Sequence, residues 1–286
     1  EQKGIKCVAF NKLIPLMAII LNNRDHRKIV VIDGKIGYTG GINLADEYIN
    51  YKTLYGHWKD AGIRLEGDAV WNFTVMFLQM WNISRDTDAD YGRYRYYFPE
   101  KMHGKGYVQP YGDTPFDNET VGENVYLNMI GCAKRYFYAF TPYLITDNEM
   151  CTALKLAAKR GVDVRIVTPG IPDKKMTYWL TQSSYQNLIE AGVKIYQYTP
   201  GFIHSKCVLC DDETAAVGTI NFDYRSFYHH FECGVLLYRA DAVQELKKDM
   251  ENTFAESEEI TLEWCRKKFM KMNVIGPFLK LFSPLF

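Results

Sequence analysis

The spacing of apolar residues divides the chain into a short first unit and a longer second unit. In the first unit, residues 26–43 predict a strand, a tight turn at an Asp-Gly pair and a second strand that ends at a Gly-Gly pair. Residues 60–67 predict a further strand, and helical spacing follows over residues 68–81. Residues 83–110 are polar, rich in Tyr and Arg and without a period, so we interpret them as a linker.

After the linker, helical and strand spacing alternate regularly. Alternation of this kind predicts an α/β sandwich built on a mixed sheet. The expected helices cover residues 123–135, 148–160, 174–191 and 241–254, and the expected strands cover residues 136–144, 162–169, 193–199, 202–211, 214–220 and 231–238.

One pattern occurs twice in the chain, as HRKIVVIDGKIGYTGGIN at residues 26–43 and as HSKCVLCDDETAAVGTIN at residues 204–221. Both copies contain HxKxxxxD with a downstream G-x-x-N, and their offset is constant at 204 − 26 = 178. Because a single HxKxxxxD arises by chance at roughly one position in 10⁴, two such copies indicate an internal duplication. The matched pairs are His26 and His204, Lys28 and Lys206, Asp33 and Asp211, Gly40 and Gly218, and Asn43 and Asn221.

The duplication predicts two related mixed-sheet sandwich domains that face each other across a pseudo-twofold axis. We expect the first domain to be incomplete on its N-terminal side, because fewer predicted strands precede its motif than precede the second motif. The expected divisions are residues 1–82 for the first domain, 83–110 for the linker, 111–257 for the second domain and 258–286 for a basic and apolar C-terminal tail.

The motif spacing suggests which side chains act together. Side chains two apart in a strand share a face, so each histidine is expected to project beside the lysine that follows it. Asp33 and Asp211 lie seven residues after their histidines, on the opposite face of a regular strand, so we interpret them as supports for the lysine or the turn. A carboxylate on a neighbouring strand is the expected orienter of each histidine: Asp60 for His26, and Glu232 for His204.

Two His-Lys pairs that face each other suit attack on a phosphodiester. A neutral imidazole is a nucleophile, a protonated one donates a proton to the leaving alkoxide, and imidazole titrates near neutral pH. The lysines, together with the amides of Asn43 and Asn221, are expected to hold the phosphate oxygens. We find no acidic cluster with metal-ligand spacing, so we predict chemistry that needs no metal and no cofactor.

Simpler roles are open for several of these residues. Asn43 and Asn221 could cap turns, and Asp60 and Glu232 could form ordinary ion pairs. The histidines without a repeat partner are expected to be structural or exposed: His57, His103, His229 and His230.

Composition narrows the partners and the compartment. A hydrophobic content of 47% indicates a globular chain, and 34 basic against 34 acidic residues disfavour a nucleic-acid partner without excluding a local basic cleft. The seven scattered cysteines fit reduced core residues, and Cys207 and Cys210 lie three apart in a predicted strand, on opposite faces. The tail mixes lysines with apolar residues, which suits either an anionic membrane surface or docking on the domain itself.

The duplicated HxKxxxxD and G-x-x-N residues resemble the phospholipase D superfamily. Longer segments, such as TPYLITDNEMCTALKLAAKRGVDVRIVTPG at residues 141–170, are similar to bacterial cardiolipin synthases, and the similarity covers nearly the whole chain. The resemblance implies two phospholipase D-like domains. It also implies a phosphatidyl transferase that joins two phosphatidylglycerol molecules and releases glycerol through a phosphohistidine intermediate.

The same resemblance implies further expectations. Family analogy favours His26 as the nucleophile, a phospholipid substrate, contact with a membrane surface, and a place at the bacterial cell membrane. Full-length members begin with membrane-spanning segments and further strands, so this chain is expected to be an N-terminally truncated piece. Two alternatives remain open: a hydrolytic phospholipase D, and a non-catalytic membrane-associated fragment.

Overall fold

The computed structural model describes residues 2–11, 23–85, 90–100, 104–268 and 276–281 of the chain. The strands are β1 (Arg24–Asp25), β2 (Val30–Ile32), β3 (Ile36–Gly40), β4 (His57–Lys59), β5 (Gly62–Glu66), β6 (Tyr107–Asp113), β7 (Tyr136–Phe140), β8 (Leu144–Ile145), β9 (Asp163–Pro169), β10 (Lys194–Tyr198), β11 (Gly201–Ile203), β12 (Cys207–Cys210), β13 (Thr214–Gly218), β14 (Phe222–Asp223), β15 (His230–Tyr238) and β16 (Ser257–Ile260). The helices are α1 (Val70–Ser84), α2 (Val121–Cys132), α3 (Asn148–Lys159), α4 (Lys175–Ser183), α5 (Tyr185–Ile189), α6 (Asp241–Ala255), α7 (Leu262–Lys267) and α8 (Gly276–Lys280), with shorter helical turns η1 (Asp46–Ile49), η2 (Tyr91–Tyr94) and η3 (Arg225–His229).

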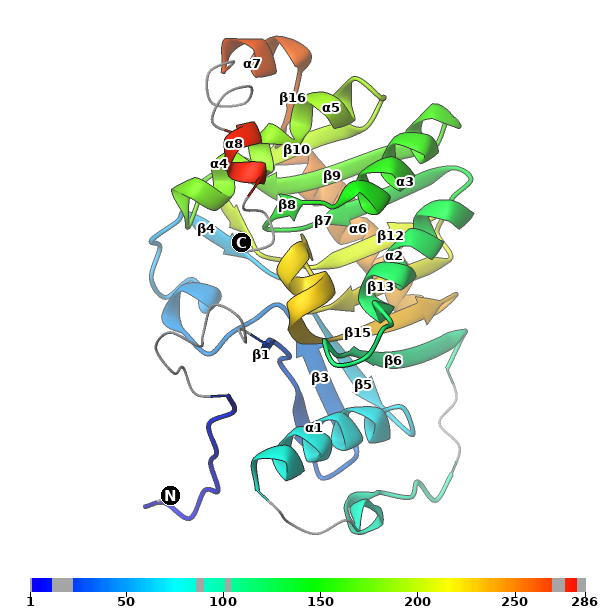
Figure 1. Cartoon of the computed structure of the whole chain (residues 1–286). Helices are drawn as coiled ribbons and strands as arrows, with labels where there is room; N and C mark the ends of the chain where they lie inside the picture. Colours follow the sequence, from blue (N-terminus) through cyan, green and yellow to red (C-terminus); the bar gives the residue numbers. More distant parts are fainter. Residues whose placement is uncertain (1, 12–22, 86–89, 101–103, 269–275, 282–286) are drawn as a thin grey trace.

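A nine-stranded mixed sheet forms the body of the molecule, in the order β1-β15-β13-β12-β7-β9-β10-β16, with β6 also paired to β15. Strands β7, β9 and β10 run parallel, whereas β12, β13 and β15 pair antiparallel. Helices α2 and α3 lie on one face of this sheet and α6 lies on the other (Figure 1). The predicted α/β fold on mixed sheets is confirmed.

Apolar side chains pack on both faces of the large sheet. On one face, Ile130 of α2 and Leu154 of α3 are fully buried. On the other, Val243 and Met250 of α6 are fully buried. Burying large apolar side chains contributes about 1.5–3 kcal/mol each, so these two layers fix the sheet on which the motif strands lie.

The first unit is smaller and packs against the second. Strands β2, β3 and β5 form a three-stranded sheet with α1 beside it, in the same chain order as β12, β13, β15 and α6. Leu65, Val70 and Phe73 of this unit join the apolar core on the α6 side of the large sheet. A single apolar core therefore holds the two motif-bearing units together.

The structure differs from the expected elements in several places. The predicted helix over residues 174–191 is two helices, α4 and α5, which meet at Ser184. The predicted strand over residues 202–211 is also two, because β11 ends at Ile203 and β12 begins at Cys207. Strand β6 was not predicted, because its sequence, YVQPYGD, contains a proline and a glycine and places its first residues in the expected linker.

The described part of the predicted tail packs on the second unit. Strand β16 pairs antiparallel with β10, Cys265 of α7 is buried, and Leu279 of α8 is buried beside residues of β8 and α4. Phe278 of α8 remains exposed. These contacts match the docking alternative, whereas membrane contact stays a prediction. Residues 269–275 and 282–286 of the tail, and His103 of the expected linker, lie outside the described part.

The two cysteines of the CxxC lie on β12 as expected. Cys207 belongs to the core on the α6 face of the sheet, whereas Cys210 belongs to the core on the α2 face. Burial raises the pKa of both thiols, that of Cys210 to about 12. They therefore face opposite sides as predicted and do not form one site.

Candidate active site

Both motifs lie at the point where one strand ends and the next begins. His26 and Lys28 fall between β1 and β2, and His204 and Lys206 fall between β11 and β12. Each lysine Nζ donates to the main-chain oxygen of its own histidine, at 2.6 Å for Lys28 and 2.5 Å for Lys206. The regular strand assumed from the sequence is therefore wrong at the motif, and this hydrogen bond holds each lysine beside its histidine.

The strand that leads into each motif pairs with a strand of the other unit. β1 of the first unit pairs parallel with the start of β15 in the second, and β11 of the second pairs parallel with β4 of the first. The main-chain N–H of His26 donates to the oxygen of Phe231 at 3.0 Å, and that of His204 donates to the oxygen of Lys59 at 2.7 Å. The residue that follows Phe231 therefore lies beside His26, and the residue that follows Lys59 lies beside His204.

Those residues are the two carboxylates named from the sequence, but with exchanged partners. His26 Nδ1 lies 2.9 Å and 3.0 Å from the two carboxylate oxygens of Glu232, and His204 Nδ1 lies 2.8 Å from Asp60 Oδ2. The expected pairing of Asp60 with His26 and of Glu232 with His204 is wrong. It assumed a partner within the same unit, whereas the parallel pairs β1–β15 and β4–β11 bring the partner from the other unit.

Burial and charge set the protonation of these pairs. Burial lowers the pKa of His26 and of His204, which favours neutral imidazoles before substrate binds. Burial alone would raise the pKa of Glu232, but the charges of its two histidine neighbours and the hydrogen bond from His26 bring that pKa below its ordinary value. The pKa of Asp60 is lowered in the same way, against the effect of burial, by the hydrogen bond from His204 and the charge of Lys206.

The two motifs are close enough that the charge of each lysine affects the pKa of the other motif's histidine. The charge of Lys206 contributes to the lowered pKa of His26, and the charge of Lys28 contributes to that of His204. Burial lowers the pKa of both lysines, that of the fully buried Lys206 to about 7. Two imidazoles and two ammonium groups from different units thus share one site.

The asparagines of the motifs bond within the protein. Asn43 Nδ2 donates to the Tyr48 hydroxyl at 2.6 Å, and Asn221 Nδ2 donates to Asp223 Oδ2 at 2.9 Å. Asn221 Oδ1 is buried and has no hydrogen-bond partner among the described residues. The expected phosphate contact of both amides stays a prediction.

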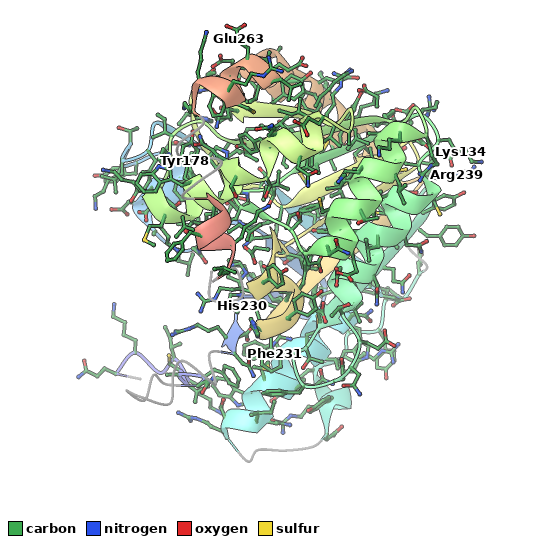
Figure 2. All side chains as sticks on the ribbon, turned by 45° about the horizontal axis from the view of Figure 1, so that its top comes forward. Lys134, Tyr178, His230, Phe231, Arg239 and Glu263 are labelled. Carbon is green, nitrogen blue, oxygen red and sulfur yellow. The ribbon has the colours of Figure 1, made fainter. Side chains whose placement is uncertain are left out.

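The motif aspartates lie in turns. Asp33 and Asp211 have positive φ values of 53° and 55°, in the left-handed region that turn aspartates tolerate. The Asp211 carboxylate accepts three main-chain N–H groups, from residues 134, 135 and 136, at 2.7 to 2.9 Å. Figure 2 shows Lys134 and Arg239, which lie near this turn, far across the molecule from His230. This position agrees with a supporting role and not with contact to a reacting group.

Sequence reasoning missed the residues that flank each histidine. His230 was expected to be structural or exposed, yet the centroid of its ring lies 5.3 Å from that of the His26 ring. In the other half, the ring centroids of Trp58 and His204 lie 5.2 Å apart. The two flanking residues occupy matching places, since Arg24 pairs with His230 and Phe202 pairs with Trp58. A signal for His230 existed, because it precedes Glu232 by two residues and so shares its face of β15.

Thr219 and Gly41 are a second unequal pair, at matched positions because 219 − 178 = 41. The Thr219 hydroxyl donates to Glu232 Oε2. A Cβ atom built on Gly41 would overlap Asp60 Oδ1, so a side chain at that position would displace the Asp60 carboxylate. The Asp60 carboxylate instead accepts the main-chain N–H of Ala61 at 2.8 Å.

Comparison with known proteins identifies a matching domain and similar chains. Residues 126–254 match the family model described as "Cardiolipin synthase, PLD-like domain". An uncharacterized protein of Streptococcus mutans is 48% identical over the whole chain, which spans 62% of that protein. A cardiolipin synthase of Geobacillus sp. (strain WCH70) is 37% identical over 99% of the chain, which spans 56% of that protein.

Among solved structures, the phosphatidylserine synthase of Haemophilus influenzae has the same fold. It superposes on 92% of this chain and 70% of its own with a TM-score of 0.67, at 14% sequence identity. The duplicated motif, the matched domain and the shared fold lead to one conclusion: residues 126–254 form a phospholipase D-like domain, and the chain as a whole is similar to bacterial cardiolipin synthases.

Proposed function

We propose that the site transfers a phosphatidyl group between two phosphatidylglycerol molecules, forming cardiolipin and releasing glycerol. The observation that carries the proposal is the crossed pairing, in which His26 is held by Glu232 and His204 by Asp60. It provides two carboxylate-oriented imidazoles in one site with two lysines. The similarity to proteins named cardiolipin synthase supports the choice of substrate.

In the first step, Nε2 of His26 attacks the phosphorus of one phosphatidylglycerol. A P–N bond forms, the P–O bond to the head-group glycerol breaks, and His204 gives its proton to the departing glycerol oxygen. We assign the attack to His26 because 24% of its side chain is exposed, against 8% for His204. The negative phosphate favours the protonated form of His204 and so offsets the effect of burial on its pKa.

In the second step, a hydroxyl of the second phosphatidylglycerol attacks the phosphohistidine. His204 removes the proton from that hydroxyl, the new P–O bond forms and the P–N bond to His26 breaks, which restores both imidazoles. Lys28 and Lys206 would neutralise the charge on the non-bridging oxygens in both steps. Glu232 and Asp60 keep Nδ1 of each ring occupied, so that Nε2 faces the phosphorus.

The surface beside the first motif suits a lipid substrate. The segment that follows Asn43 exposes large apolar side chains to solvent, among them Leu44, Ile49 and Leu54. Such groups next to a phosphate site fit insertion into a membrane surface, where we place the reaction in bacterial cells. None of the described helices is long and apolar enough to cross a bilayer.

The test is turnover of phosphatidylglycerol in mixed micelles with a chelator present. We expect cardiolipin and glycerol in equal amounts, and a loss of about 10³-fold or more in His26→Asn and in His204→Asn, since both lose an essential proton or nucleophile. His229→Asn is the matched control, because His229 lies on η3 outside the pairs described. Full turnover in either histidine variant would contradict the mechanism.

The same assay separates the hydrolytic alternative. Phosphatidic acid with little cardiolipin would mean that water reaches the phosphohistidine in place of the second lipid. A wild-type protein that shows no turnover but still binds lipid vesicles would favour the non-catalytic alternative.

A further inference from the structure

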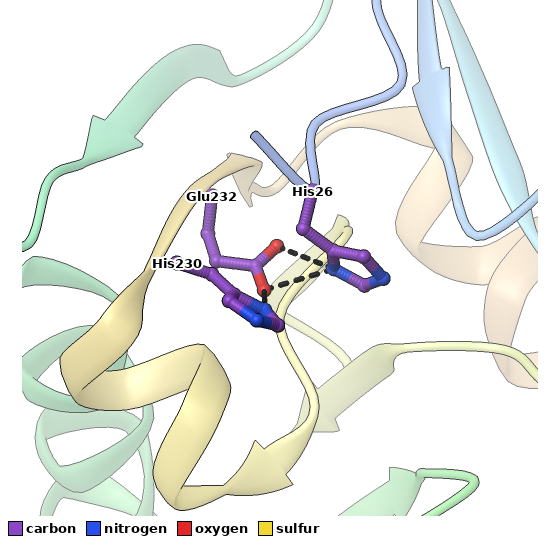
Figure 3. A group of neighbouring side chains, drawn as sticks. All are labelled: His26, His230 and Glu232. Atoms are coloured by element: carbon purple, nitrogen blue, oxygen red, sulfur yellow. Dashed lines mark hydrogen bonds and ion pairs between the residues drawn. The ribbon is translucent and has the colours of Figure 1, made fainter. Parts of the chain in front are cut away.

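We propose that His26, His230 and Glu232 form a binding site for a divalent transition metal ion, with Zn²⁺ the best match, and that the bound ion blocks His26. Figure 3 shows the Glu232 carboxylate between the two imidazole rings. One ligand atom from each of the three residues lies within 4.8 Å of the other two. Tetrahedral zinc, with Zn–N and Zn–O bonds of about 2.0–2.2 Å, holds its ligand atoms roughly 3.5 Å apart, so small rotations of the three side chains would close the cluster on an ion.

His230 supplies the observation that points to a ligand. Its side chain is only 11% exposed, and neither ring nitrogen has a hydrogen-bond partner among the described residues. Its nearest acceptor, Glu232 Oε1, lies 3.5 Å from Nδ1, beyond the usual length of a hydrogen bond. A buried imidazole that lacks a hydrogen bond of ordinary length is costly, and a metal ion would satisfy it.

The chemistry of the three donors selects the ion. Two imidazole nitrogens and one carboxylate oxygen suit zinc and similar metals, whereas Mg²⁺ and Ca²⁺ prefer oxygen ligands. Three protein ligands leave a fourth position for water. The cluster is also reachable, because 24% of the His26 side chain is exposed.

The other half of the site provides a natural comparison. His204 and Asp60 match His26 and Glu232, but Trp58 stands where His230 stands. The indole cannot coordinate a metal, so that half offers two donors and the His26 half offers three. The site is therefore expected to bind one ion and not two.

Binding would have a direct consequence for His26. A neutral imidazole with a metal on Nδ1 keeps its proton on Nε2, and a protonated Nε2 has no lone pair to attack phosphorus. Zinc is thus expected to inhibit, whereas a chelator preserves activity. Metal binding itself does not depend on the proposed function and is measured separately.

The experiment titrates Zn²⁺ into the metal-free purified protein in competition with a chromophoric chelator. We expect one tight site in the wild type, a loss of affinity in His230→Asn that is larger than the roughly 10- to 100-fold typical when only an outer partner of a ligand is removed, and no change in His229→Asn. Circular dichroism checks that both variants fold. Equal affinity in the wild type and His230→Asn would overturn the proposal.

X-ray absorption of the zinc-loaded protein identifies the ligands independently. Nitrogen and oxygen neighbours alone are expected, and sulfur neighbours would overturn the proposal by assigning the ion to the free cysteines. In the turnover assay, His230→Asn should resist zinc at least tenfold better than the wild type. If the protein shows no turnover but binds zinc as described, the proposed function fails and the metal site stands.

Discussion

The two halves of the site share a backbone plan but differ in the residues around each histidine. In both, a strand leading to a motif pairs parallel with a strand of the other unit, and the histidine beyond it meets a carboxylate. His26 lies beside His230, and its partner Glu232 accepts a hydrogen bond from the Thr219 hydroxyl. His204 lies beside Trp58, and its partner Asp60 lies against Gly41 with no room for a side chain at that position. The first half is thus more polar and more open, and the second is more apolar and enclosed. Duplication preserved the pairing while its surroundings diverged, which is how two equivalent histidines can take different roles.

The largest expected effect comes from breaking the crossed pairs. Glu232→Gln and Asp60→Asn keep the size of the side chain but remove the charge that orients each imidazole. By analogy with other carboxylate-oriented histidines, each change should lower kcat by about 10²- to 10³-fold. Turnover of phosphatidylglycerol measures the loss, and a loss below fivefold in both variants would contradict an orienting role.

Alanine substitutions at the matched positions Gly41 and Thr219 should have smaller and unequal effects on activity. In Gly41→Ala the new methyl group displaces the Asp60 carboxylate from His204, so we expect about 10²-fold lower kcat/KM. Thr219→Ala removes one hydrogen bond to Glu232, whose other partners remain, so the loss should be less than about tenfold. Thr219→Ser should restore the wild-type rate. Equal losses in the two alanine variants would mean that the halves are equally sensitive at this position.

At neutral pH the smallest effect comes from the titration of Lys206. The pKa of Lys206 is lowered to about 7 by burial, so its charged fraction falls as the pH rises through 7. If that charge holds the phosphate, kcat/KM should decline about tenfold per pH unit above this point. Lys206→Arg should move the decline to higher pH, because arginine stays protonated. A decline moved by Lys28→Arg and not by Lys206→Arg would assign it to the other half.

The sequence predicts the local features of the molecule well. The helical spacing over residues 68–81 and 148–160 matches α1 and α3 closely, because each helix buries one regular apolar face. The duplicated motif also identifies the histidines and lysines that the fold brings together. These successes depend on patterns within short segments.

Long-range pairing could not be predicted in the same way. Asp60 and Glu232 are recognisable as carboxylates that follow a histidine, but their true partners depend on which strands of different units lie side by side. Strand β6 was hidden because its stability comes from pairing with β15 and not from its own composition. His230 was overlooked because the matching position in the other unit is a tryptophan, Trp58. Comparison of the two copies of the repeat therefore could not identify it.

Nuclear magnetic resonance of the imidazole Nδ1–H protons tests the crossed pairing most directly. A proton held between Nδ1 and a carboxylate exchanges slowly and gives its own signal, so the wild type should show one for His26 and one for His204. Glu232→Gln should shift or remove the His26 signal alone, and Asp60→Asn the His204 signal alone. The reverse assignment, with Asp60→Asn affecting His26 and Glu232→Gln affecting His204, would contradict the account.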